Sequence, residues 1–280
     1  MPVKIAKPNT AARRNMSFID RTGLHRGAPV KALSQGRKRL SGRAGLGKIS
    51  TRHRGGGEKK LLREIDFGQS KLGVPAKVER LEYDPNRSAW LALLLYADGE
   101  RRYILAWEGA AVGDAVVCAE QAPEKLGSRM PLKHITPGLT VYNVEIMPGR
   151  GGKLFRAAGT GAILMDIQDV YAQIKAPSGE IRLIPKDSYA TLGRASNADW
   201  WLMSVGSAGR SRHMGHRPVV RGKAQNPVDH PHGGGEGNQS IGLKYPKTKW
   251  GKHALGVKTR RKGKYSDYLI LERRGKKKES

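Results

Sequence analysis

The sequence predicts a mainly β protein in which two small β domains are flanked by two extended basic arms. Three observations support this prediction. Short apolar runs recur between turn residues through 64–200, this range lacks sustained helical periodicity, and nearly all of the net positive charge lies outside it. We therefore expect four parts: a basic N-terminal arm over 1–63, β domains over 64–122 and 123–200, and a basic C-terminal arm over 201–280.

The N-terminal arm, residues 1–63, carries 17 Lys or Arg and 2 Asp or Glu, a net charge of +15. Glycines alternate with basic residues through Ser34–Gly45 and again through Thr51–Gly57. A segment with so few apolar residues cannot bury enough surface to offset the entropy lost when the chain is ordered. We expect this arm to be extended or flexible until it meets a partner.

The first β domain contains two predicted turns, at Asp84–Arg87 and Ala97–Glu100, where Pro, Asn, Asp and Gly favour turn geometry. The apolar pattern around these turns predicts four strands: Val74–Tyr83, Ala89–Tyr96, Arg101–Ala106 and Ala115–Ala119. The continuous apolar run Ala89–Tyr96 is typical of a strand buried on both faces. Short strands at regular spacing indicate a small barrel or sandwich.

The second β domain follows a predicted linker at Pro123–Pro131. Its apolar runs predict four more strands: Thr140–Met147, Ala162–Met165, Tyr171–Ala176 and Ile181–Pro185. The glycine-rich loop Pro148–Lys153 lacks the spacing of a P-loop, so an exposed hairpin loop and a specific RNA contact both fit it. We expect a second small barrel.

The C-terminal arm, residues 201–280, carries 19 Lys or Arg and 5 Asp or Glu, a net charge of +14. Together the two arms account for almost all of the formal net charge of +28. Charge at this density repels itself unless a polyanion neutralises it, and nucleic acid is the commonest such partner. A solvated tail that only keeps the protein soluble is the alternative.

Other features limit the class of protein. The single cysteine, Cys118, rules out an internal disulfide, fits a reducing compartment, and follows apolar residues as a buried side chain would. The longest apolar run, Ala89–Ala97, is far shorter than the ~20 residues of a membrane span, and the basic N-terminus has no apolar signal core. Trp107, Trp200 and Trp201 are candidates to stack on bases, whereas Trp90 is expected in the core.

Several motifs resemble the bacterial form of the ribosomal protein L2 family, in order and over nearly the whole chain. They are Val78–Ala89, Ala97–Leu105, Val141–Glu145, Gly149–Lys153, Ala190–Gly193 and, above all, Asn226–Gly237. Three features depart from the family pattern, and one of them is Gln225, where the bacterial pattern tends to have Met. Glu58 follows the glycines where the family usually has His and a basic residue, and Arg212–Gly215 replaces the usual Trp-Arg-Gly.

The resemblance implies an OB-fold barrel, then an SH3-like barrel, with arms that penetrate ribosomal RNA in the large subunit of the cytoplasmic ribosome. It also implies a place near the peptidyl-transferase centre, contacts with neighbouring ribosomal proteins and the small subunit, and support for tRNA binding and peptide-bond formation. We expect RNA binding by Arg52, His53, Arg54, Lys59, Arg150, Lys153, Arg210, Arg217, Arg221, Lys223, Asn226, His230, His232, Arg260, Arg261 and Lys262.

The stretch Asn226–Gly237 gathers Asp229, His230, His232 and Glu236 around three consecutive glycines. A protein-held transition metal is disfavoured, because no helix places the two histidines on one face. Mg²⁺ shared between a carboxylate and RNA phosphates is the favoured ion, and no protein cofactor is expected. Proton transfer by His230 is the sharpest hypothesis, and a loop shaped to contact RNA is the preferred one.

The predicted function is therefore a non-enzymatic structural protein bound to ribosomal RNA. Two alternatives belong to other classes. One is a metal-dependent nucleic-acid enzyme that uses the histidines and carboxylates of 213–236. The other is a protein that coats nucleic acid without preference for one folded RNA.

Overall fold

The computed structural model describes residues 3–36 and 40–274. The described chain is built mainly of antiparallel strands, so the prediction of a mainly β protein is confirmed. Its helices are short: α1 (Ala11–Arg14), α2 (Ala208–His213) and the 3-10 turns Lys31–Leu33, Leu132–His134, Ala198–Leu202 and Gly222–Ala224. Among the described residues, neither helix has the length and apolar character needed to cross a membrane.

The chain divides into two compact units, each made of segments that are far apart in the sequence. The first, which we call the barrel unit, contains Met1–Lys38, Lys59–Ser207 and Ser266–Ser280. The second, the basic unit, contains Arg39–Glu58 and Ala208–Tyr265. The arms predicted as 1–63 and 201–280 are thus each divided between the two units.

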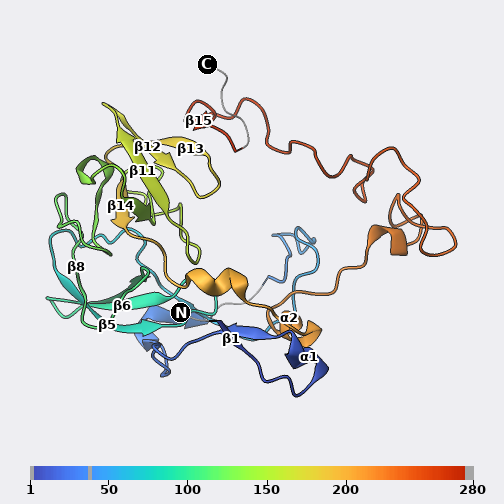
Figure 1. The fold of residues 1–280 in the computed structure, drawn as a ribbon, viewed down its shortest axis with the longest axis horizontal. Coiled ribbons are helices and arrows are strands. Elements are labelled where there is room, and N and C mark those ends of the chain that lie inside the picture. Colours follow the sequence, from blue (N-terminus) through green and yellow to red (C-terminus); the bar gives the residue numbers. More distant parts are fainter. Residues whose placement is uncertain (1–2, 37–39, 275–280) are drawn as a thin grey trace. The chain divides into compact units, whose positions relative to one another are not determined.

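The first sheet of the barrel unit has the strand order β7-β6-β5-β8. Its strands are β5 (Ala76–Glu82), β6 (Leu91–Tyr96), β7 (Arg101–Leu105) and β8 (Ala115–Val116), shown in blue-green and green in Figure 1. All four correspond to predicted strands. A bulge between Val78 and Arg80 bends β5, which pairs with β6 and also with β8. Such bending lets one strand serve two sides of a closing barrel.

The N-terminal segment packs on this sheet instead of standing apart from it. Strands β1 (Val3–Ile5) and β2 (Ser17–Ile19) pair with each other, and Ile19 and Leu24 are buried in the same core as β6. The backbone N–H of Val30 donates to the Tyr103 hydroxyl at 3.0 Å. The sequence pattern did not reveal this because two isolated apolar residues form no periodic signal.

Strands β3 (Ser34–Gly36) and β4 (Leu61–Arg63) pair antiparallel, so the stretch between them leaves the barrel unit and returns to the same place. Strand β4 thus lies at the end of the N-terminal arm that the sequence predicted to be extended or flexible.

The second sheet has the order β15-β13-β12-β11-β10-β14-β9. Its strands are β9 (Arg129–Pro131), β10 (Thr140–Tyr142), β11 (Ala162–Ile167), β12 (Tyr171–Lys175), β13 (Ile181–Pro185), β14 (Tyr189–Leu192) and β15 (Ile270–Glu272). Strand β9 lies inside the stretch Pro123–Pro131, which the sequence predicted to be a linker. It is an edge strand of this sheet, and its last residue is a proline, which has no N–H to donate to a neighbouring strand. Strand β15 pairs with β13, so the chain rejoins the barrel unit after residues 208–265.

The two sheets enclose separate cores that meet at a few side chains. Tyr142 of β10 is buried among first-sheet residues, and its hydroxyl donates to the Leu105 carbonyl at 3.0 Å. Trp107 and Ala195 form a bridge between the two β domains. Trp90 and Cys118 are buried as predicted, and Trp107 is buried too, so its indole is not available for stacking on RNA. The arrangement agrees with an OB-type barrel followed by an SH3-like barrel.

Candidate nucleic-acid interface

Positive charge is concentrated in the basic unit. Its two segments hold 19 Lys or Arg and 3 Asp or Glu, a net of +16 out of +28 for the chain. They also hold six of the eight histidines. A surface of one sign at this density attracts polyanions and raises their rate of association.

A short backbone ladder joins the two segments. The N–H of Gly55 donates to the Gly215 carbonyl, and the N–H of Arg217 donates to the His53 carbonyl, both at 3.0 Å. Arg54 and His216 form the bridge between these two bonds. Segments of the two predicted arms are therefore paired with each other.

Side chains reinforce this ladder. Arg54 Nη1 lies 2.9 Å from His216 Nδ1, and because a guanidinium only donates, this imidazole nitrogen must accept. His213 Nδ1 lies 2.8 Å from Glu58 Oε1. These two residues come from stretches that depart from the family pattern, so two of the departures contact each other.

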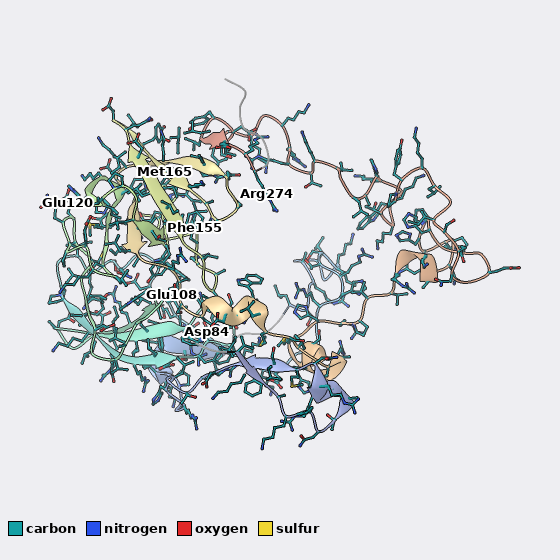
Figure 2. All side chains as sticks on the ribbon, in the orientation of Figure 1. Asp84, Glu108, Glu120, Phe155, Met165 and Arg274 are labelled. Atoms are coloured by element: carbon teal, nitrogen blue, oxygen red, sulfur yellow. The ribbon has the colours of Figure 1, made fainter. Side chains whose placement is uncertain are left out.

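The basic unit has no apolar core among the described residues. Every buried hydrophobic residue of the described chain belongs to the barrel unit, and Figure 2 shows the side chains of 208–265 spread out along the ribbon. Burial of apolar surface is the main force that offsets the entropy of folding. The described part of the basic unit is therefore held together by local hydrogen bonds and ion pairs.

The loop Asn226–Gly237 is organised around its two histidines. The backbone N–H groups of Asp229 and His230 both donate to the Asn226 carbonyl, at 2.9 and 3.1 Å. The N–H of His232 donates to His230 Nδ1 at 3.0 Å, and the two rings lie edge to face with centroids 4.7 Å apart. His232 Nε2 in turn accepts the N–H of Lys247 at 2.8 Å.

One nitrogen of each ring acts as a hydrogen-bond acceptor. While it accepts the N–H of His232, Nδ1 of His230 carries no proton. Desolvation, followed by the nearby His232 and Arg52, lowers the pKa of His230 from its usual 6.5. Both imidazoles therefore use one ring nitrogen to shape the loop.

The glycines of this region make room for side chains. A Cβ on Gly222 would lie 2.6 Å from the His230 ring, and a Cβ on Gly233 would lie 2.4 Å from the Asn226 carbonyl oxygen. Both distances are shorter than real Cβ contacts. Gly234 has a φ of +89° and would place a Cβ 2.8 Å from Pro227. A larger residue at any of the three would change the loop.

The carboxylates of the loop are not gathered with its imidazoles. Asp229 and Glu236 are exposed, while His230 and His232 are partly buried. Among the described residues, no three His, Cys, Asp or Glu side chains lie together in an arrangement that could hold a metal ion. The upstream histidines also face elsewhere, His213 toward Glu58 and His216 toward Arg54.

A second basic feature, the loop Ile146–Lys153, lies in the barrel unit and is positioned by a buried ion pair. Arg129 Nη2 donates to Glu145 Oε1 at 2.9 Å, and Glu145 Oε2 accepts the N–H of Gly149 at 3.0 Å. Burial lowers the pKa of the Arg129 guanidinium, and the adjacent Glu145 carboxylate opposes this shift. The loop leaves Arg150 and Lys153 exposed.

The same arginine ties the two β domains together. Its Nη1 donates to the Asn143 carbonyl at 2.8 Å and to Thr191 Oγ1 at 3.2 Å. Its Nε donates to the Gly68 carbonyl at 3.1 Å. The sequence does not single out Arg129, because this residue lies within the predicted linker Pro123–Pro131.

The predicted RNA-binding side chains fall into three groups. Arg150 and Lys153 are on the barrel unit, as is Lys59 beside the junction of the units. The first segment of the basic unit carries Arg52, His53 and Arg54. The second carries Arg210, Arg217, Arg221, Lys223, Asn226, His230, His232, Arg260, Arg261 and Lys262. Most of these side chains are exposed; those of His53, Arg210, Lys223, His230 and His232 are partly buried.

One exposed cluster was not identified from the sequence. Residues 245–254 form a hairpin that carries the exposed Trp250 among lysines. The signal was present in Lys247–Lys252, where a tryptophan stands among three lysines, but it was not separated from the general basic composition of the arm.

Two family models match the chain. Residues 30–118 match a model described as Ribosomal Proteins L2, RNA binding N-terminal domain. Residues 125–251 match a model described as Ribosomal Proteins L2, C-terminal domain. The first match covers the first β domain and one segment of the basic unit. The second covers the second β domain and the other segment as far as the hairpin.

Proposed function

The chain belongs to the ribosomal protein L2 family and is a structural, RNA-binding protein of the large ribosomal subunit; we propose that its basic unit is the part that enters folded ribosomal RNA. The observation that carries this proposal is a net charge of +16 on a unit without a buried hydrophobic residue in its described part. RNA phosphates supply the neutralising charge, and RNA grooves supply the surface against which the unit is ordered.

The basic unit binds as one body. The ladder between Gly55 and Gly215 keeps Arg52 and Arg54 beside His216 and Arg217, so the guanidinium groups of both segments reach the same stretch of RNA. Arginine suits this task because its planar fork matches phosphate oxygens and stacks on bases. The barrel unit adds a separate contact through Arg150 and Lys153.

The loop Asn226–Gly237 has a positioning role near the peptidyl-transferase centre, supporting tRNA binding and peptide-bond formation without being the catalyst. Support comes from the two imidazoles, each of which already uses one nitrogen to hold the loop. A general base would have to give up its contact with the loop to accept a substrate proton at that nitrogen. The location itself follows from the family resemblance.

Mg²⁺ joins this loop to RNA, shared between phosphate oxygens and the carboxylate of Asp229 or Glu236. Both carboxylates are exposed on a unit with only one other acidic residue. Magnesium prefers oxygen ligands and keeps several waters, so one or two carboxylates suffice when phosphates complete the shell.

Further partners are neighbouring ribosomal proteins and the small subunit, in a cytoplasmic ribosome. The barrel unit suits protein contacts, because its central range 64–120 carries 6 Lys or Arg and 10 Asp or Glu. The net charge of this range is negative, whereas that of the basic unit is positive. A negative surface favours contacts with basic protein surfaces over contacts with phosphates.

The decisive experiment is a footprint of the full chain on large-subunit RNA, with affinity measured over a range of salt concentrations. We expect protection of one folded region and a log–log salt slope of about −0.7 to −0.9 per neutralised phosphate. Bulk duplex DNA should compete weakly. Equal competition by DNA would favour the coating alternative, and affinity unchanged by salt would overturn the proposal. RNA hydrolysis that chelators abolish would favour the enzyme alternative.

A further inference from the structure

Residues Tyr245–Ala254 form a compact hairpin in the basic unit, which we call the tryptophan hairpin. Lys247 and His253 pair across it as an antiparallel bridge, and the N–H of Thr248 donates to the Lys252 carbonyl at 2.7 Å. The turn is closed by Gly251, whose φ of +76° favours glycine and whose N–H donates to the Thr248 carbonyl at 2.9 Å. The tip therefore has a defined shape even though it lacks an apolar core.

Trp250 lies at this tip with 68% of its surface exposed. The other tryptophans differ: Trp90 and Trp107 are buried, and Trp200 is partly buried against Trp201. Trp201 is 67% exposed, but it is on the barrel unit and its Nε1 donates to the Ala158 carbonyl at 3.3 Å. An exposed indole has a flat apolar face that an aromatic partner can cover.

Cations from both segments surround this indole. The Lys249 ammonium lies 4.9 Å from the ring centroid, and the Arg52 guanidinium carbon lies 5.4 Å from it. Lys247 and Lys252 flank the tip along the same hairpin. An aromatic face surrounded by cations is the combination that binds a nucleobase and its neighbouring phosphates together.

The hairpin is also joined to the Asn226–Gly237 loop. The N–H that His232 Nε2 accepts belongs to Lys247 at the base of the hairpin, and the Tyr245 and His253 rings lie with centroids 4.3 Å apart on the same hairpin. The position of the indole is thus set by the loop as well as by its own turn.

We propose that the tryptophan hairpin is a base-stacking site, in which the Trp250 indole stacks on an unpaired RNA base while Arg52, Lys249 and their neighbours bind the adjacent phosphates. The proposal rests on the proposed function and specifies one contact within it. An RNA base fits better than an acidic protein, because cations beside an exposed flat indole match phosphates that lie beside a base.

The test uses the tryptophan fluorescence of the full chain, titrated with a short single-stranded oligoribonucleotide and with an abasic strand of the same length. Both strands present phosphates, but only the first can stack. We expect quenching by the base-bearing strand and about tenfold tighter binding of it than of the abasic strand. Trp250→Ala should abolish both differences, and Trp250→Phe should retain part of the affinity difference.

Trp201→Ala is the matched control, since it removes an equally exposed indole from the barrel unit; the base-dependent difference should persist in it. The proposal is overturned if the two strands bind and quench alike, if Trp201→Ala removes the difference, or if an acidic peptide of equal charge quenches as strongly. The salt-dependent binding of ribosomal RNA is measured on the same proteins. If the wild-type chain shows no salt-dependent binding of ribosomal RNA, the proposed function is refuted. If Trp250→Ala keeps this binding and still prefers the base-bearing strand to the same extent, only the stacking site is refuted.

Discussion

Arg129 and Glu145 form an ion pair inside the barrel unit, with Nη2 2.9 Å from Oε1 and both side chains almost fully buried. The pair does more than neutralise charge. The arginine donates to backbone carbonyls of both β domains, and the glutamate accepts the Gly149 N–H within the loop that carries Arg150 and Lys153. One buried interaction thus links barrel packing to the presentation of an exposed basic loop.

Replacing Arg129 with Ala should strongly destabilise the barrel unit. The change leaves the Glu145 carboxylate buried without its cation and removes donors from several carbonyls. Breaking a buried pair in this way costs about 3–5 kcal/mol. The free energy of unfolding, followed by urea titration of the buried tryptophans, measures the loss.

The exposed pair between Lys133 and Glu120, 3.2 Å apart, provides the control. Glu120→Gln should change the free energy of unfolding by less than about 1 kcal/mol, because exposed pairs are weak. An Arg129→Ala protein as stable as Glu120→Gln would show that the buried pair contributes nothing.

The sequence could predict the strands but not this pair. The eight predicted strands rest on short apolar or alternating patterns between turns, a local signal that tertiary packing did not overturn. Arg129 has no such signal, because a charged residue beside Pro131 is typical of a linker. Its burial depends on Glu145 and Gly68, which are distant in the sequence, so only the fold reveals it.

His230 should titrate below its usual pKa. Its Nδ1 accepts a backbone hydrogen bond, and desolvation together with His232 and Arg52 disfavours the charged ring. A histidine with a lowered pKa binds fewer protons in the folded chain. Its contribution to loop stability is therefore complete above pH 6.5 and declines as the pH falls below that value.

Histidine NMR of the RNA-free chain measures this titration, with His230→Gln used to assign the signal. We expect a midpoint below 6.5 and a parallel change in the amide signal of His232. A midpoint at or above 6.5 would contradict the arrangement of the two rings. Bound RNA should raise the midpoint, because phosphates favour the charged imidazole.

Gly222→Ala should displace the His230 ring. The added Cβ would lie 2.6 Å from that ring, and Gly222 is not held in the left-handed region, so the effect is steric alone. We expect a changed His230 spectrum and weaker binding to ribosomal RNA. Gly45→Ala in the other segment, where nothing lies within 4 Å, is the control and should leave both unchanged. Identical behaviour of the two variants would rule out the packing of Gly222 against His230.

The composition of the Asn226–Gly237 loop indicated its importance, yet its geometry could not be predicted. Pro, Gly and Asn mark an irregular loop, but they do not say which imidazole nitrogen accepts which N–H. The pairing of Gly55 with Gly215 could not be predicted from the sequence for another reason. It joins residues 160 positions apart through glycine backbone, and glycine has no side chain whose pattern could reveal a partner.

The basic unit should be the least protected part of the RNA-free chain. Its described residues bury no hydrophobic side chain, and its backbone hydrogen bonds lie near the surface, so local opening costs little free energy. Hydrogen exchange followed by mass spectrometry should show rapid exchange through 40–58 and 208–265, and slow exchange in β6 and β12. Adding large-subunit RNA should protect both basic segments together, because the ladder between Gly55 and Gly215 makes them one body. Protection of one basic segment without the other would show that the two segments bind RNA independently. Slow exchange in both segments before RNA is added would show that the basic unit is ordered without RNA.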